Sequence, residues 1–169
     1  MLLTPIRFDE NEWFVIITGL GLIFFCKWLK KPLPKLVILT ISMYFFFLGL
    51  TVDHIIGADH PFNLYDTMDR SSIDIFDLIV YGWHYPFYGY CFSLIIYQFK
   101  PKGLNAVLFV CGWSTLSVTL EVIAVYFSVF QYLRWHQIYS FFTYLLVFGT
   151  SYVFIKKLFH SYQSKIAPF

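Results

Sequence analysis

Charge is the scarcest property of this sequence. Asp, Glu, Lys and Arg together make up only 13% of its 169 residues, whereas an ordinary soluble domain has about a quarter. Hydrophobic residues make up 59% and aromatic residues 23%. A chain with so little charge cannot cover a folded domain with a water-compatible surface, and it offers no basic patch for nucleic acid. The composition therefore predicts an integral membrane protein.

Catalytic and ligand-spacing motifs are missing as well. The three cysteines have no CxxC or Cys/His spacing and lie in or beside apolar runs, so we expect reduced thiols that pack as small hydrophobic groups. No Ser/His/Asp order, phosphate-binding loop or flavin motif is visible, and we expect no cofactor and no enzymatic activity. The first charged cluster is acidic and no small-x-small cleavage site follows, so we expect the first apolar segment to be retained.

Apolar segments of membrane-crossing length occur five times, since a spanning helix needs about 20 residues. We therefore expect a single all-α membrane domain over residues 1–169. It would be a polytopic transmembrane helical bundle with five spans, at about 13–29, 36–55, 73–99, 104–127 and 138–159. The first segment is short, so the alternative is four spans with an interfacial N-terminal helix.

The basic residues predict the orientation of these spans. Nine of the 12 Lys and Arg residues would lie on one side, with no acidic residue: Lys27, Lys30, Lys31, Lys35, Lys100, Lys102, Lys156, Lys157 and Lys165. The other side would hold Arg7, Arg70 and Arg134 with Asp9, Glu10, Glu12, Asp59, Asp66 and Asp69. Because positively charged loops stay in the cytoplasm, we expect an external N-terminus and a cytoplasmic C-terminus.

A polar stripe runs along the outer part of the third predicted span. Its members follow at steps of three and four residues and so share one helix face: Asp74, Asp77, Tyr81, His84 and Tyr88. Ionisable groups within a span should face other helices or water. The stripe predicts either the wall of an outer cavity, with His84 as proton acceptor, ligand or sensor, or interhelical bonds that fix packing. Pro86 predicts a kink.

Glu121 is the only acidic residue within the fourth predicted span, and it shares a helix face with Ser117. A carboxylate in hydrocarbon is unfavourable by several kcal/mol unless it is paired or protonated. At about 1.5 Å per residue, Glu121 and His84 both lie roughly 9 Å below the outer ends of their helices. A contact between them is geometrically possible. The competing hypotheses are a coupled proton or cation site and a structural group bonded to tyrosines and serines.

Acidic and imidazole side chains follow the second predicted span, at Asp53-His54 and Asp59-His60. Both groups are good ligands for zinc or iron, but sequence neighbours point in different directions on a helix. This makes a weak metal hypothesis for His54 and His60, and a hydrated helix end is the competing interpretation. Further candidates are expected on the outer face: Asp53, His54, Tyr65, Asp66, Trp135, Tyr139 and Ser140.

Short motifs also give the sequence a likeness to a known family. They are, in chain order, Tyr65-Asp66, Tyr85-Pro86, Glu121, Trp135, Tyr139-Ser140-Phe141 and Tyr144. In these residues the chain resembles a family of small multi-pass integral membrane proteins of Bacillus and related spore-forming Gram-positive bacteria. The resemblance implies a plasma-membrane location and a pattern that often has four spans. It implies no activity.

Three classes of function fit these residues. We favour a non-enzymatic membrane protein that binds or modulates a partner, either another membrane protein or a second copy of itself. The second class is a proton- or cation-linked transporter or ligand-binding protein with an outward-facing polar cavity around Glu121, His84 and Asp77. The sequence lacks the internal repeats common in carriers. The third class, a membrane-embedded metal-dependent enzyme, has poor ligand spacing. The lipid bilayer is a partner in all three.

The orientation is testable by cysteine accessibility. With Asn11→Cys, Asn63→Cys or Ser164→Cys as the single cysteine, an impermeant thiol reagent applied to intact cells should label positions 11 and 63 only. Labelling of position 164 from outside would contradict a cytoplasmic C-terminus.

Overall fold

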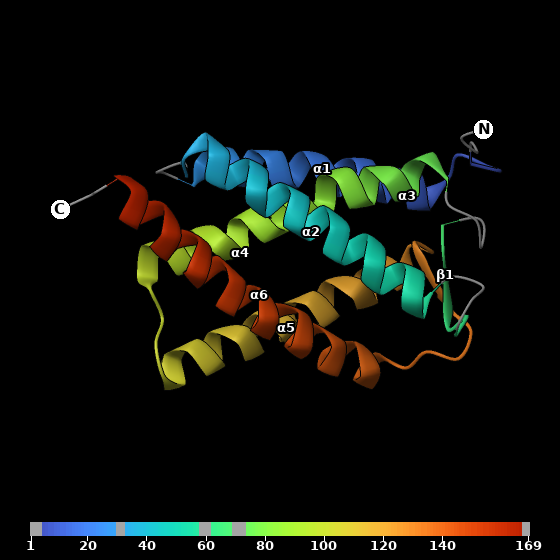
Figure 1. Ribbon diagram of the computed structural model, residues 1–169. Coiled ribbons are helices and arrows are strands. Elements are labelled where there is room, and N and C mark those ends of the chain that lie inside the picture. Colours follow the sequence, from blue (N-terminus) through green and yellow to red (C-terminus); the bar gives the residue numbers. More distant parts are fainter. Residues whose placement is uncertain (1–4, 30–32, 58–61, 69–73, 167–169) are drawn as a thin grey trace.

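Long helices dominate the computed structural model, which describes residues 5–29, 33–57, 62–68 and 74–166 (Figure 1). Four of these helices are long and apolar enough to cross a membrane: α1 (Glu10–Trp28), α2 (Lys35–Ile56), α5 (Leu104–Tyr126) and α6 (Gln137–Ile166). Many of their large apolar side chains face outwards, including Phe24 at 75% and Leu146 at 70% exposure. Water disfavours such a surface and lipid accepts it. The expected helical architecture is confirmed.

The helix boundaries follow the expected spans with two differences. α2 and α5 begin and end within one residue of their predicted limits. α1 begins at Glu10 instead of residue 13, because Asp9 and Glu12 form a reciprocal capping box there. α6 continues to Ile166, past the predicted end at residue 159.

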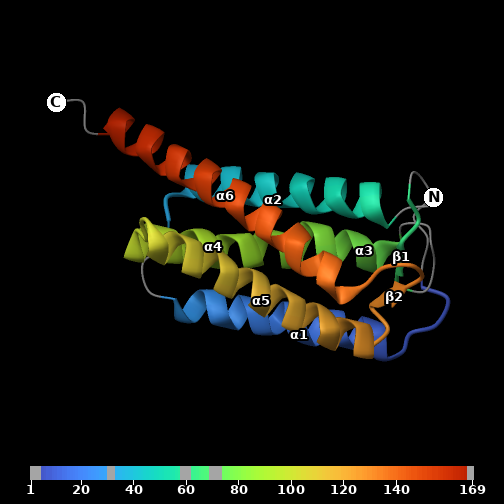
Figure 2. The ribbon, with the colours of Figure 1, turned by 90° about the horizontal axis from the view of Figure 1, so that it is seen from below.

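The helix expected at residues 73–99 is divided into three segments. They are α3 (Ile75–Ile79), the π-helical turn η1 (Val80–His84) and α4 (Tyr85–Phe99). Pro86 explains the division, because it has no backbone N–H to donate and its ring crowds the carbonyl one turn earlier. In the wider π-turn the Tyr85 N–H donates to the Val80 carbonyl. Figure 2 shows α3 and α4 nearly in line, so the expected kink takes the form of a π-turn in one segmented rod.

Two short strands join loops that the sequence assigned to separate polar linkers. β1 (Tyr65–Thr67) pairs antiparallel with β2 (Phe130–Tyr132), and Tyr65 lies opposite Tyr132. The carbonyl of Leu64 accepts bonds from three successive backbone N–H groups that follow β2. This ladder ties the α2–α3 loop to the α5–α6 loop at one end of the bundle. The all-α expectation missed it, because three-residue strands have no periodicity that a sequence can display.

About midway along its helices, the bundle is packed around aromatic residues. Phe45, Phe92 and Phe148 come from α2, α4 and α6, and each is at most 5% exposed. The ring centroids of Phe92 and Phe148 are 5.1 Å apart. The rings fill this part of the bundle and leave the space near the strands to other groups.

Two glycines allow α2 and α4 to approach closely. A Cβ added at Gly49 would lie 1.9 Å from the Tyr85 ring, and one added at Gly89 would lie 2.1 Å from the Phe45 ring. Such distances are far inside van der Waals contact, so only glycine fits this seam. The seam fixes the outer part of α2, which carries Asp53, against η1 and α4.

The seam is testable with Gly89→Ala. The added methyl group overpacks the α2–α4 contact, and we expect a loss of about 1–3 kcal/mol in the free energy of unfolding. Reversible unfolding in mixed micelles measures it. Gly112→Ala in α5 is the control, because its Cβ would meet open space. Equal effects of the two substitutions would contradict the close approach.

Candidate functional site

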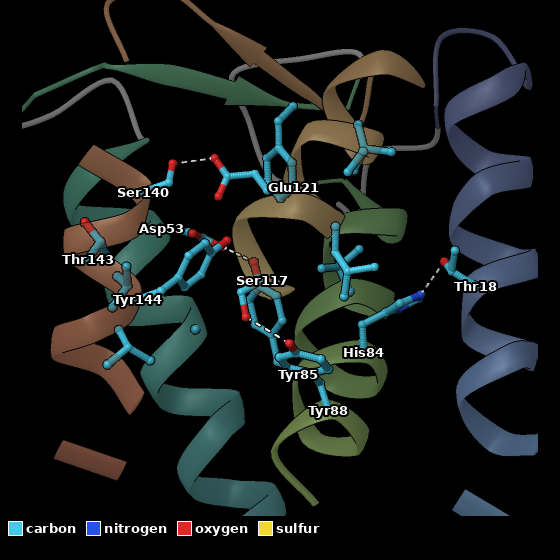
Figure 3. Close-up of a pocket in the computed structure, with 18 of the residues that line it drawn as sticks. Thr18, Asp53, His84, Tyr85, Tyr88, Ser117, Glu121, Ser140, Thr143 and Tyr144 are labelled. Atoms are coloured by element: carbon cyan, nitrogen blue, oxygen red, sulfur yellow. Dashed lines mark hydrogen bonds between the residues drawn. The ribbon is translucent and has the colours of Figure 1, made fainter. Parts of the chain in front are cut away.

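A cavity of about 500 Å³ lies among the helices at the end where the strands pair. Small-molecule sites in proteins commonly have about 300–1,000 Å³. Its lining comes from α1, α2, η1, α4, α5, α6 and both strands, and it is mostly apolar. The polar lining residues are Thr18, Asp53, Tyr65, His84, Tyr85, Tyr88, Ser117, Glu121, Tyr132, Trp135, Ser140, Thr143 and Tyr144 (Figure 3). Among the described lining residues there is neither Lys nor Arg.

Tyrosine hydroxyls hold Asp53 in place from two sides. Tyr65 donates to its Oδ1 at 2.5 Å and Tyr85 donates to its Oδ2 at 2.7 Å. The sequence allowed Asp53 to be part of a hydrated helix end. In the structure β1 folds Tyr65 over the end of α2, so the half-buried carboxylate lines the cavity.

Glu121 receives its hydrogen bonds from β2 and α6. Tyr132 and Ser140 both donate to its Oε1, the serine at 2.6 Å. The indole N–H of Trp135 donates to the Ser140 hydroxyl at 2.7 Å, which completes a relay ending on the carboxylate. Tyr144 of α6 lines the same cavity, as Figure 3 shows. The expectation of a group bonded to tyrosines and serines describes this arrangement, and the carboxylate also faces a cavity.

The strand ladder couples the two carboxylates. Tyr65 and Tyr132 are partners across it, and they donate to Asp53 and Glu121 respectively. The carboxylates lie within electrostatic range of each other. Neutral hydroxyl donors position a carboxylate without cancelling its charge. The cavity therefore combines two acidic groups with an otherwise neutral wall.

His84 faces the cavity from η1, with its ring directed at α1. Its Nε2 lies 3.1 Å from the Thr18 hydroxyl (Figure 3). The possible contact with Glu121 is not formed, because within the described chain the hydrogen bonds of Glu121 come from β2 and α6. The π-turn adds a residue to the turn that carries His84, which changes the direction of the ring. His84 and Glu121 are thus separate parts of one cavity lining.

The predicted polar stripe divides between two roles. His84 and Tyr88 line the cavity, and the Tyr88 hydroxyl lies 2.9 Å from that of Ser117 on α5. Asp77 and Tyr81 are outside the described lining. The Asp77 carboxylate accepts the Asp74 N–H at 2.9 Å in a capping box that begins α3.

The outer-face candidates are similarly divided. Tyr65, Trp135 and Ser140 line the cavity. His54 and Tyr139 are exposed, and Asp66 lies in β1 opposite Gln131. His60 lies outside the described residues, so the structure gives no position for it. Within the described ranges, no group of three or more His, Cys, Asp or Glu side chains is placed to hold a metal ion.

Both strand tyrosines remain neutral hydrogen-bond donors. Burial is the main cause of the raised pKa of Tyr65, and the negative charge of Asp53 adds to it. The pKa of Tyr132 is also raised, by burial and then by its bond to Glu121. Each hydroxyl therefore keeps its proton at any physiological pH.

Sequence reasoning did not include five polar lining residues among its site candidates: Thr18, Tyr85, Tyr132, Thr143 and Tyr144. Tyr85 follows Tyr81 by four residues, and Tyr144 follows Ser140 by four, so helical spacing offered a signal for both. Thr18 is an isolated hydroxyl in an apolar helix, where bonding to its own helix backbone is the common role. It does bond to the Phe14 carbonyl, at 2.6 Å, in addition to approaching His84.

Comparisons with protein-family models, with curated proteins and with solved structures give no match for this chain. The geometry of the cavity is therefore the basis for inferring a function.

The bond between Tyr65 and Asp53 is testable by a double-mutant cycle. Tyr65→Phe removes a donor to a charged acceptor, so we expect a loss of about 1.5–3 kcal/mol in the free energy of unfolding. In an Asp53→Asn background the loss should shrink by about 0.5–3 kcal/mol. Tyr126→Phe is the control, because Tyr126 is 80% exposed. A loss of equal size in both backgrounds would show that the hydroxyl acts independently of Asp53.

Proposed function

We propose that this protein is a non-enzymatic, multi-pass membrane protein that binds a small organic cation in the cavity between Asp53 and Glu121. One observation carries the proposal. Two carboxylates face the cavity, and the described lining residues include no Lys or Arg. Both carboxylates are held by neutral hydroxyls, so a cation would supply the missing counter-charge.

The rest of the lining supports the same chemistry. Aromatic rings surround the carboxylates, including Tyr85, Trp135 and Tyr144. The faces of such rings attract organic cations, and the attraction is stronger where water is excluded. The volume of about 500 Å³ would take an organic ion and is within the range of drug-sized ligands. A bare metal ion is less well suited, because the described residues bring no three ligating side chains together.

We also propose how the chain crosses the membrane. The segmented rod α3–η1–α4 is the third of five spans, alongside the four helices of membrane-crossing length. The lysine-rich ends face the cytoplasm of a Gram-positive cell, and the strand-capped end faces outwards. In this orientation the cavity lies in the outer half of the plasma membrane, with the N-terminus outside and the C-terminus inside.

Partner binding is the second candidate function. Apolar side chains stand exposed beyond the spanning helices at the strand-capped end, namely Phe8, Phe62 and Leu133 at 54%, 57% and 53%. These positions lie outside the long apolar helices, so lipid tails do not fully account for them. Another membrane protein or a second copy of this chain would cover them.

Cation binding is testable with benzyltrimethylammonium as the probe. Purified protein in lipid nanodiscs should bind it, and Glu121→Gln or Asp53→Asn should weaken the affinity at least about tenfold. Isothermal titration calorimetry measures the affinity, and retained thermal unfolding shows that each variant is folded.

The matched control is Glu10→Gln, which removes an exposed carboxylate outside the cavity. It should leave the affinity unchanged. Absence of binding by the folded wild-type protein, or equal weakening in the Glu10 variant, would contradict the proposed function.

A further inference from the structure

We propose that the ligand is a single-chain amphiphilic cation that enters from the bilayer, through an opening between α1 and α5 with Gly21, Phe25 and Leu120 at its rim. This inference rests on the proposed cation-binding function and specifies both the ligand and its route. It follows from where the cavity lining is exposed, how α1 is attached and how the polar groups are distributed.

Exposure of the lining marks the place where the cavity opens. Of the described lining residues, only Gly21, Phe25 and Leu120 are exposed, the last two at 42% and 44%. Two belong to α1 and one belongs to α5. All three are apolar, so the opening meets lipid and offers no polar path to water.

The rim residues of the two helices lie at the same depth. Phe14 of α1 and Phe127, directly after α5, stack with ring centroids 4.8 Å apart. Gly21 lies seven residues beyond Phe14, and Leu120 lies seven residues before Phe127. Because α1 and α5 run in opposite directions, both positions are about 10 Å below the stack. The stack thus forms the outer edge of the opening.

Contacts of α1 leave this side of the bundle open. α1 packs against α3, η1 and α4, and contact between the α1 and α5 backbones is sparse. Figure 1 shows the two helices well separated, at opposite margins of the bundle. Side chains join α1 to the rod at Thr18–His84 and at Trp83, whose indole N–H approaches the Gly19 carbonyl at 3.4 Å.

The outer end of the cavity, near the strands, is less exposed than the side between α1 and α5. Tyr65, Met68 and Val129 are each at most 7% exposed in the strand region. The Tyr65 ring packs edge-on against Phe130 and Trp135. A ligand arriving from this end would meet Tyr65, the same tyrosine that donates to Asp53.

Polar and apolar parts of the lining are separated along the helices. Asp53, Glu121 and Ser140 lie near the strands, whereas the deeper lining on α1, α2 and α6 is apolar: Leu22, Phe25, Phe45, Leu48, Val147 and Phe148. From Asp53 to Phe45 the cavity follows α2 for about 12 Å. A charged head at the carboxylates with one hydrocarbon chain along this wall matches both parts.

The route is testable by obstructing the rim. A Cβ at Gly21 meets no atom within 4 Å and Gly21 is exposed, so Gly21→Trp adds an indole at the rim without a clash at its Cβ. With a fluorescent octyltrimethylammonium probe in lipid nanodiscs, stopped-flow measurements should show association and dissociation both slowed at least about tenfold. The equilibrium affinity should change little, because an obstruction raises the barrier in both directions.

Two further variants complete the design. Gly112→Trp is the matched control, since Gly112 is exposed, has open space at its Cβ and is outside the cavity lining. It should leave both rates unchanged. Leu120→Trp obstructs the rim from the α5 side and should reproduce the slowing if Gly21→Trp proves unstable.

Chain length provides an independent measurement. Octyltrimethylammonium should bind at least about tenfold more tightly than tetramethylammonium, because each methylene finds apolar wall. Unchanged rates in both rim variants, or equal slowing in Gly112→Trp, would overturn the lateral route. Equal affinity for the two ions would overturn the amphiphilic ligand. If benzyltrimethylammonium and both alkyl ions fail to bind the wild-type protein, it is the proposed function that fails.

Discussion

Asp53 and Glu121 have to be accommodated inside a bundle of long apolar helices. A carboxylate there needs hydrogen-bond donors that the interior of a helix backbone cannot provide, since those N–H groups already donate to carbonyls of their own helix. Tyr65 and Tyr132, which lie opposite each other in the two strands, each donate to one carboxylate, and Tyr85 and Ser140 supply a second donor to each. The small ladder is therefore more than a loop connection, because it sets the position of both acidic groups at once.

The rest of the bundle has a tightly packed half, away from the strands, and a loose half, near the strands, that contains the cavity. Away from the strands, Phe92 and its aromatic neighbours close the space between helices, and Gly49 and Gly89 bring α2 against α4. Near the strands the helices surround the cavity. The tight half gives α2 a fixed direction, so Asp53 is carried on a rigid support. The loose half leaves α1 attached mainly to the segmented rod.

Local sequence patterns predicted the features that depend on neighbouring residues, such as the helices and their breaks. Apolar length located the helices, and Pro86 indicated a break in the third of them, although the π-turn itself could not be foreseen. Helical spacing put His84 and Glu121 at a common depth, but it could not tell which neighbours each would find. Tyr132 and Ser140 reach Glu121 only because the chain after α5 turns back through β2. Such long-range pairings carry no periodic signal, so Asp53 could equally have belonged to a hydrated helix end.

The choice of hydroxyl donors has a consequence for binding. An arginine or lysine beside Asp53 and Glu121 would have satisfied them and left the cavity neutral and closed to cations. Tyrosine and serine hold the same carboxylates in place and leave their charge available to a ligand. Because Tyr65 also seals the strand-capped end, opening that route would cost Asp53 one of its donors. The proposed path between α1 and α5 would disturb none of these hydrogen bonds, so in this proposal ligand exchange does not compete with the positioning of the carboxylates.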